Sequence, residues 1–183
     1  MSNSPTPSSP SHQKGIELFR AGQYDEARRA FEEARAEAQR ADDRQAEGQA
    51  LNDLGAAYQK LRQHDQARQS FEAAIRLFAD LGDDRRRAQA MGNLGTLLGE
   101  MKKHREAIIR LEQAADVFTR IGDKQSAALT LKWLSRTYLQ NWDFLEAIFA
   151  YERALARLEP LPPDQALLRK LLQIPMRILS RGT

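Results

Sequence analysis

The pattern that decides the fold lies in the stretch LNDLGAAYQKLRQHDQARQSFEAA, which spans residues 51–74. Its large, small and aromatic positions follow a fixed order: Leu51, Leu54, Gly55, Tyr58, Ala67, Phe71 and Ala74. Forty residues further on, the same positions hold Met91, Leu94, Gly95, Leu98, Ala107, Leu111 and Ala114, and forty further still Leu131, Leu134, Ser135, Tyr138, Ala147, Tyr151 and Ala154. Forty residues upstream they hold Ser11, Lys14, Gly15, Leu18, Ala27, Phe31 and Ala34, where only the first turn departs from the pattern. A fixed period of this length is the signature of a repeat protein.

Each repeat predicts two helices joined by a tight turn. Apolar residues recur every three or four positions on both sides of Arg62, which is the helical period. Breaks recur as well: they lie near Gly22, Arg62, Lys102 and Trp142 inside the repeats, and at Ala41-Asp42-Asp43, Leu81-Gly82-Asp83, Ile121-Gly122-Asp123 and Leu161-Pro162-Pro163 between them. Glycine in such a break allows the positive φ that ends a helix, and aspartate can cap the helix that follows.

Two glycines stand in the middle of predicted helices. Gly55 and Gly95 each cost their helix about 1 kcal/mol relative to alanine. We expect that the paired helix approaches closely at these positions, where a side chain would block it. Ala67 and Ala107 on the second helices fit the same requirement.

The order Leu-Gly, then Tyr three residues on, then Ala, then Phe four residues on, resembles the tetratricopeptide repeat. The resemblance covers residues 12–160 in four repeats, at 12–41, 42–81, 82–121 and 122–160. These units are longer than the usual unit of about 34 residues, and the first three lack its closing proline. Their Gly-Asp hinges look like those of a forty-residue subclass found in spindle-orientation adaptors and bacterial regulatory proteins. The resemblance implies an all-α fold, a right-handed α-solenoid of four helix-turn-helix repeats.

The two ends of the chain predict different structures. Residues 1–11 are rich in Ser and Pro, carry no charge and lack the pattern of a secretory signal, so we expect a disordered tail. Near the other end, Leu171, Ile174 and Ile178 continue the forty-residue register. Residues 164–181 therefore predict a C-terminal capping helix, because a stacked array needs its last apolar face covered. Pro175 is expected to kink that helix.

Composition excludes several classes of protein. The chain has no cysteine, which excludes disulfides, thiolate metal sites and cysteine nucleophiles. Its net charge of +3 comes from 28 basic and 25 acidic residues that are interspersed, whereas a nucleic-acid-binding protein usually concentrates its cations. No apolar run approaches the length of about 18 residues that a membrane span needs. We therefore expect a cytoplasmic chain with no nucleic-acid partner and no stable membrane insertion.

The three histidines do not predict a metal or catalytic site. His64 and His104 are forty residues apart, at the position that Tyr24 and Phe144 hold in the other repeats, so we interpret them as rings packed in the turns. His12 lies at the start of the first predicted helix, which we expect to be frayed. Because no set of nucleophile, base and orienting group can be read from the sequence, we predict no enzyme activity, no cofactor and no metal.

The resemblance also implies a concave binding groove lined by the first helix of each repeat, with ligands touching positions around the Leu-Gly pair. On this chain the positions are Gln49, Asn52, Asp53, Ala56 and Lys60 in the second repeat, Gln89, Asn93, Thr96 and Glu100 in the third, and Lys132, Trp133, Arg136 and Gln140 in the fourth. Amide side chains suit an extended peptide because they both donate and accept. Trp133 and Arg136 could supply an aromatic anchor and a carboxylate fork. The alternative is that these residues are ordinary solvated ones and that Trp133 packs against the capping helix.

We therefore predict a non-catalytic scaffold or adaptor that binds a peptide or helix of a partner protein. The alternative is a self-assembling structural module in which the C-terminal helix forms a homodimer or contacts a membrane surface. Two interpretations of Trp142 stay open, a second contact surface or a ring folded back on Phe144 or Phe149. A carboxylate clamp for chaperone tails is not expected, because His12 and Ile16 stand where Lys and Asn are needed.

Overall fold

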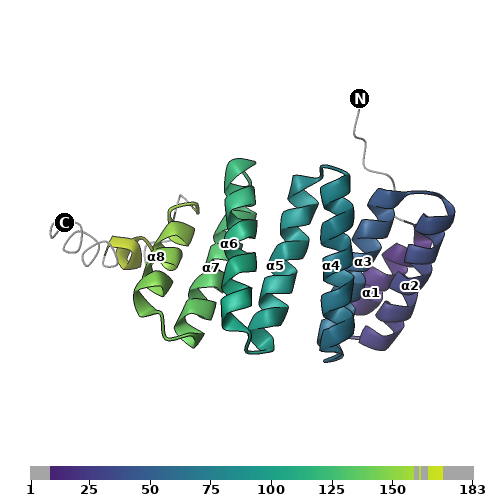
Figure 1. Ribbon diagram of the computed structural model, residues 1–183, viewed down its shortest axis with the longest axis horizontal. Coiled ribbons are helices and arrows are strands. Elements are labelled where there is room, and N and C mark those ends of the chain that lie inside the picture. The colour runs from purple at the N-terminus through teal and green to yellow at the C-terminus, as the bar shows by residue number, and fades with distance from the viewer. Residues whose placement is uncertain (1–8, 159–160, 162–164, 171–183) are drawn as a thin grey trace. The chain divides into compact units, whose positions relative to one another are not determined.

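The computed structural model describes residues 9–158, 161 and 165–170, and the described residues form helices joined by short turns (Figure 1). The helices are α1 (Pro10–Arg20), α2 (Tyr24–Arg40), α3 (Arg44–Lys60), α4 (His64–Asp80), α5 (Asp84–Glu100), α6 (His104–Arg120), α7 (Lys124–Gln140) and α8 (Phe144–Leu155). Residues 165–170 are helical as well. The predicted all-α class is therefore confirmed.

The turns follow the predicted breaks. In each turn between α1 and α8 the second residue has a positive φ, and these residues are Gly22, Asp42, Arg62, Gly82, Lys102, Gly122 and Trp142. After α4, for example, the N–H of Asp83 donates to the carbonyl of Phe78 at 2.9 Å, which satisfies a carbonyl left free at the helix end. The same aspartate then caps α5, since its Oδ1 accepts from the N–H of Arg86 at 2.9 Å. Asp43 and Asp123 cap α3 and α7 in the same way.

The close helix approach expected at Gly55 is confirmed. A Cβ built on Gly55 would lie 2.6 Å from the ring of Phe71, and one built on Gly15 would lie 2.5 Å from the ring of Phe31. These distances are far below van der Waals contact, so only glycine lets the phenyl rings of the second helices seat against the first helices. Ala67, where a small residue is also expected, is fully buried.

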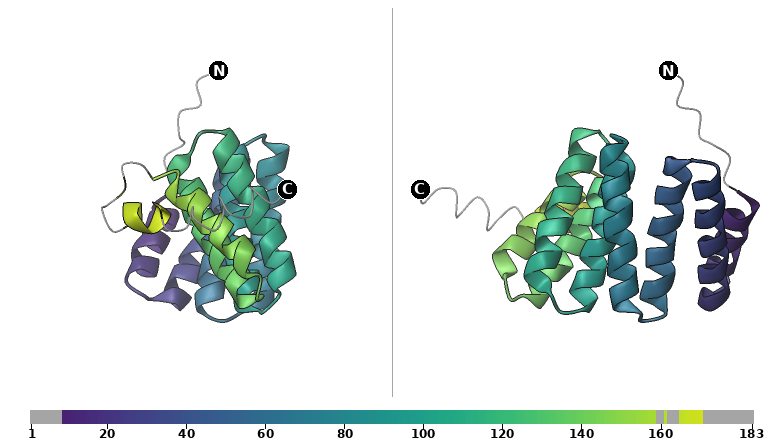
Figure 2. Two further views of the ribbon diagram at one scale, coloured as in Figure 1. Left: turned by 90° about the vertical axis from the view of Figure 1, so that its left-hand side faces the viewer. Right: turned by 45° about the vertical axis from the view of Figure 1, so that its right-hand side comes forward.

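The chain divides into two compact units, residues 1–97 and residues 98–183, with the division inside α5. In the first unit α1 packs on α2, α2 on α3 and α3 on α4, as the ribbon views show (Figure 2). One core cluster there contains Ala27, Phe31, Leu54 and Ala57, and a second contains Leu51, Ala74, Phe78 and Ala90. Each of these helices buries an apolar stripe of side chains against its neighbours. Repeat arrays build their core in this way.

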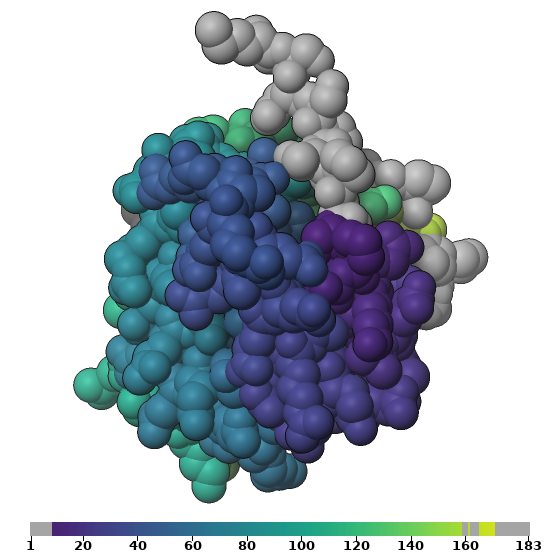
Figure 3. Space-filling model, turned by 90° about the vertical axis from the view of Figure 1, so that its right-hand side faces the viewer, coloured from purple at the N-terminus to yellow at the C-terminus, as the bar shows by residue number. Residues whose placement is uncertain are grey.

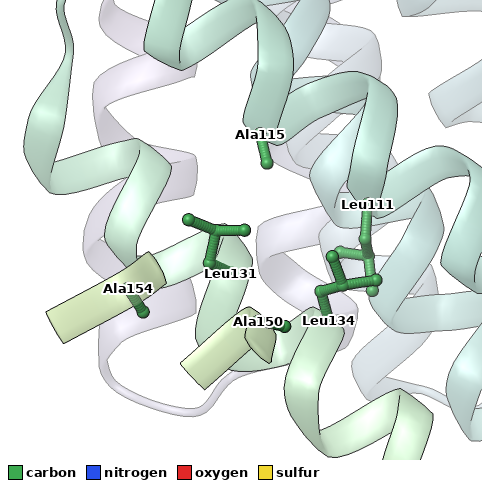
Figure 4. Close-up of a cluster of buried hydrophobic side chains, with 6 residues drawn as sticks. All are labelled: Leu111, Ala115, Leu131, Leu134, Ala150 and Ala154. Carbon is green, nitrogen blue, oxygen red and sulfur yellow. The ribbon is translucent and has the colours of Figure 1, made fainter. Parts of the chain in front are cut away.

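The second unit is built in the same way. Here α6 packs on α7 and α7 packs on α8. Their shared cluster contains Leu111, Ala115, Leu131, Leu134, Ala150 and Ala154 (Figure 4). Leucine side chains meet alanines across the helix pairs, so the helices pack closely. None of the helices in the described part of the chain is long and apolar enough to cross a membrane.

Two helix boundaries differ from the predicted ones. We expected a tail over residues 1–11, but α1 begins at Pro10, because Ser9 caps it by accepting from the N–H of His12 and proline favours the first helical turn. The fourth repeat was expected to run to residue 160, but α8 ends at Leu155 with Ala156 as its C-cap. Of the predicted capping helix over 164–181, only residues 165–170 are described, and Pro162, Pro163 and residues 171–183 lie outside the described residues.

Candidate functional site

Three of the predicted groove residues form a chain of hydrogen bonds in the first unit. The amide of Asn93 donates to Oδ1 of Asn52 at 2.9 Å, and the amide of Asn52 donates to Oδ1 of Asp53 at 3.2 Å. The other oxygen of Asp53 lies 2.8 Å from Nε2 of His12. This series of hydrogen bonds joins α5, α3 and α1, which are the first helices of three successive repeats.

His12 is a member of this hydrogen-bonded series that the sequence interpretation missed. Instead of fraying, its side chain is buried, with 6% of the residue exposed, and its ring lies 5.7 Å from the ring of Phe31. A buried polar side chain needs a partner, and Asp53 provides it. A signal for this pairing exists in the sequence, because His12 and Asp53 are separated by the same 41 positions as Asn52 and Asn93.

Two of the hydrogen-bonded residues, Asn52 and Asp53, line a small polar recess. Its volume is about 50 Å³, and it is lined by Gln49, Asn52, Asp53, Phe78, Arg86 and Gln89. Four of these are predicted groove residues, so the structure brings that part of the prediction together. Arg86 was not predicted. Its guanidinium is held by Asp83, with 2.6 Å between Nη1 and Oδ2.

The predicted groove residues that do not line this recess include Ala56, Asn93 and Glu100, and also Thr96 and Lys60. The hydroxyl of Thr96 donates to the carbonyl of Asn93 at 2.8 Å, so it is used inside its own helix. Lys60 is exposed in the last turn of α3, where a cation interacts favourably with the helix dipole. Both positions have an adequate local explanation without a ligand.

The predicted groove residues of the fourth repeat lie on α7 in the second unit. The guanidinium carbon of Arg136 stands 5.6 Å from the centroid of the Trp133 ring, within the range of a cation–π contact. Trp133 is 40% exposed, and Leu129 one turn earlier is exposed as well. Gln140 is exposed and Lys132 is half-buried. Leu129, Trp133, Arg136 and Gln140 follow helical spacing, so they form one stripe, which we call the α7 stripe.

The other aromatic and histidine positions have structural explanations. His64 and His104 are half-buried at the first residues of α4 and α6, in agreement with rings packed at the turns. The ring of Trp142 makes an edge contact with Phe144 at 5.8 Å, as one of its two interpretations expected. Trp142 is also 79% exposed, and its use as a second contact surface stays a prediction. Within the described residues no group of histidines and carboxylates could hold a metal ion.

Comparison with solved structures places this fold among known helical repeat proteins. BtubC (BKLC) from P. vanneervenii superposes with a TM-score of 0.72 at 24% identity, over 82% of this chain and 62% of that one. The nearly identical TPR-like repeats of a putative kinesin light chain from Podosopora anserina give 0.72 at 18% identity, over 89% and 88%. A Rap protein complexed with competence and sporulation factor gives 0.71 at 17% identity, over 81% and 42%. This chain thus spans less than two thirds of BtubC and of the Rap protein, and at these identities the similarity concerns the fold.

Sequence comparison defines the family. No curated protein matches the chain. The family model of the tetratricopeptide repeat matches three overlapping segments, residues 11–80, 47–120 and 86–159. Together these matches span nearly all of the eight helices, and successive matches begin about one repeat apart. The chain therefore belongs to the tetratricopeptide repeat family.

Proposed function

We propose that this protein is a non-catalytic scaffold that holds a peptide or helix of a partner protein on the first helices of its repeats. Membership of the tetratricopeptide repeat family supports a protein-interaction scaffold in general. The observation that carries the specific proposal is the polar recess of the first unit, where Gln49 and Gln89 stand beside the hydrogen-bonded Asn52 and Asp53.

The chemistry of the recess suits a peptide backbone. The amides of Gln49 and Gln89 each offer a donor and an acceptor, which is what a peptide unit requires. Asn52 and Asp53 are already fixed by hydrogen bonds, so they lose little conformational freedom when a ligand binds. In the second unit, the α7 stripe offers Trp133 as an apolar anchor and Arg136 as a partner for a carboxylate.

The charge pattern favours a protein partner over nucleic acid. Many of the arginines are paired with nearby carboxylates, as Arg28 is with Glu32 at 2.7 Å and Arg68 with Glu72 at 2.9 Å. Such pairs leave little of the concentrated positive potential that phosphate backbones need. We propose that this scaffold acts as an adaptor in the cytoplasm.

The test replaces the two glutamine amides of the recess. Affinity capture with the full chain followed by mass spectrometry would compare the wild type with the double variant Gln49→Ala and Gln89→Ala. The matched control is Gln66→Ala with Gln69→Ala, two exposed positions on α4. We expect partners to be lost only by the first variant, with helicity unchanged. Identical partner sets for all three proteins would refute binding at the recess.

A second candidate function is self-association through the C-terminal segment. Leu167 is 60% exposed and Leu168 is 38% exposed. Two adjacent exposed leucines on a helical segment are an apolar surface that a second copy could cover. This candidate concerns the end of the second unit and makes no use of the polar recess.

A further inference from the structure

A pocket separate from the polar recess lies in the first unit, where the start of α1, the end of α2 and the start of α3 meet. Its volume is about 240 Å³. Figure 3 views this unit from the side of α1 and α2, which are coloured purple to indigo. The wall of the pocket includes four alanines, Ala34, Ala38, Ala41 and Ala46, together with the carboxylates of Glu37 and Asp43.

Comparison of the repeats shows why the pocket exists. Three residues of the pocket wall in the first repeat are Glu37, Ala38 and Ala41. At the corresponding positions, forty residues later, the second repeat has the large apolar residues Leu77, Phe78 and Leu81. Phe78 is fully packed, with 2% exposed, and its ring reaches within 2.8 Å of the position of a Cβ on Gly48. Phe78 thus fills space in the second repeat that Ala38 leaves open in the first, and Glu37 adds a carboxylate beside it.

The first helix of the first repeat is also shorter than that of the second. α1 has 11 residues, whereas α3 has 17. In the forty-residue register, a helix equivalent to α3 would begin at residue 4, but α1 begins at Pro10. α1 itself therefore does not extend along the end of α2 as α3 extends along α4.

Glu37 supplies an ionised group to this pocket. The hydroxyl of Ser11 donates to its Oε1 at 2.7 Å. Hydrogen bonding by the hydroxyls of Ser9 and Ser11 and, to a lesser extent, the charge of Arg40 hold the pKa of Glu37 below its usual range. Oε2 of Glu37 is buried and has no hydrogen bond of good geometry among the described residues, although Ser9 is near enough to help lower the pKa. A buried carboxylate oxygen without a donor favours a ligand that brings one.

The basic side chains that line the pocket already have carboxylate partners. Arg86 is paired with Asp83 at 2.6 Å, and His12 contacts Asp53 at 2.8 Å. Neither of these groups competes for Glu37, since no hydrogen bond or ion pair joins them to it in the described part of the chain. Asp43 accepts from the N–H of Ala46, which leaves its negative charge in place. The charge available to a ligand is therefore negative, and the alanines beside it offer an apolar wall.

We propose that this pocket binds the side chain of a lysine or arginine, with its alkyl stem along the alanine wall and its cation at Oε2 of Glu37. The proposal rests on the proposed function, because the basic residue belongs to the partner peptide. Gln49 and Arg86 line both the pocket and the polar recess, so a peptide bound along the recess reaches the pocket directly. The preferred partner segment is thus one with a basic residue beside the stretch that the amides hold.

The first experiment uses n-butylguanidinium, which has the stem and the charge of an arginine side chain. Titration of the full chain followed by NMR should shift the amide resonances of Ala38, Ala41 and Ala46. Glu37→Gln should weaken binding about tenfold or more, the loss expected for a charge-assisted hydrogen bond. Glu33→Gln, an exposed position on the same helix, should change nothing. Equal binding of neutral 1-pentanol would overturn the proposal, because the pocket would then be only an apolar cavity.

A second variant keeps the test independent of misfolding. Ala38→Phe restores the side chain of the second repeat, so it should fill the pocket and abolish probe binding while the melting temperature stays equal or rises, as cavity-filling substitutions commonly do. Unchanged binding of n-butylguanidinium by Ala38→Phe would contradict the proposal. So would binding seen only in a chain that lacks residues 1–8, because the pocket would then serve the N-terminus of the protein itself.

Peptide binding separates this inference from the proposed function. A peptide panel in which one position holds arginine or its neutral isostere citrulline would be probed with wild type and Glu37→Gln. We expect a preference for arginine that Glu37→Gln loses and Glu33→Gln keeps. Peptides that bind through Gln49 and Gln89 without that preference would refute the proposed cation pocket and leave the proposed scaffold function standing. Binding of n-butylguanidinium at Glu37 without any peptide binding would overturn the scaffold and leave the cation site.

Discussion

The hydroxyl of Tyr138 on α7 donates a hydrogen bond to Oε1 of Glu112 on α6 at 2.6 Å. Tyr58 on α3 makes the same bond to Glu32 on α2 at 3.0 Å, with the same separation of 26 residues. In each case the first helix of one repeat is tied to the second helix of the repeat before it. The bond therefore repeats with the fold, once in each unit.

This bond predicts a loss of stability in alkali. Burial, and then the neighbouring carboxylate, raise the pKa of Tyr138 and of Tyr58 above the usual value for tyrosine. The folded chain thus retains protons that the unfolded chain releases above about pH 10, and the free energy of unfolding falls as the pH rises through that range. Urea unfolding at a series of pH values should show a smaller alkaline loss for Tyr138→Phe than for wild type. An unaltered pH profile would contradict the assignment, and Tyr151→Phe is the control.

Alanine usually stabilises a helix relative to glycine, but at Gly55, which contacts Phe71, we predict the opposite. Gly55→Ala should destabilise the protein by about 1 to 3 kcal/mol, because the new methyl overlaps the ring and overpacking outweighs the better helix former. Gly99→Ala is the matched control. Its nearest neighbour beyond the helix, the hydroxyl of Thr137, lies 3.9 Å from the new atom. This control should gain about 0.5 to 1 kcal/mol in chemical denaturation. An increase in stability for both variants would mean that the ring of Phe71 moves aside at little cost.

The chain of hydrogen bonds through Asp53 predicts a cost when its centre is removed. Asp53→Ala leaves the ring nitrogen of buried His12 and the amide of Asn52 without their acceptor. The free energy of unfolding should fall by about 1 to 3 kcal/mol, measured by urea denaturation. Asp65→Ala, at an exposed position in the first turn of α4, should cost about 0.5 kcal/mol. Equal effects for the two aspartates would show that the buried chain adds nothing to stability.

The second residue of each turn has a positive φ, so introducing glycine there should stabilise the protein and removing glycine should destabilise it. Arg62 is exposed and has a φ of 58°, so Arg62→Gly should stabilise the chain by about 0.5 to 1 kcal/mol by removing left-handed strain. Gly82 has a φ of 67° and open space around it, so Gly82→Ala should cost about 1 kcal/mol for the same reason. Thermal unfolding measures both. A gain for Gly82→Ala would contradict the strain argument.

The exposed leucines of residues 165–170 predict the behaviour of the self-association alternative. If a second copy covers them, Leu167→Glu should convert a dimer to a monomer in analytical ultracentrifugation, while the melting temperature at low concentration is unchanged. Lys170→Glu on the same segment controls for the added charge, since Lys170 is also exposed. A wild-type chain that sediments as a monomer at all concentrations would remove this alternative.

The repeats and turns could be predicted because their signals are local. Glycine at 22, 82 and 122 and aspartate at 43, 83 and 123 determine φ and capping within a few residues, and their spacing alone gives the helix order. The end of α8 could not be predicted in this way. No helix-stopping residue stands at Ala156, and the prolines that indicated the boundary come later in the chain.

The candidate site was predictable in part. Gln49, Asn52, Asp53 and Gln89 were expected from the resemblance, and they line one recess. His12 was missed because a histidine near a helix start appears exposed until its partner, 41 residues away, is brought beside it. The pocket at Glu37 was also missed. Its signal lies in the difference between the first and second repeats at Ala38 and Phe78, whereas a search for repeats looks for what they share.

The hydrogen bond between Asn93 and Asn52 has a consequence for assembly during folding. Repeats of similar sequence can pair in the wrong order or exchange between neighbouring molecules, because their apolar faces are nearly interchangeable. The position of Asn52 holds His12 in the repeat before it and Lys132 two repeats later, so only the native neighbours complete the set of donors and acceptors. A mispaired array would bury amides and carboxylates without partners. The series of polar contacts thus distinguishes the correct neighbours among the first three repeats.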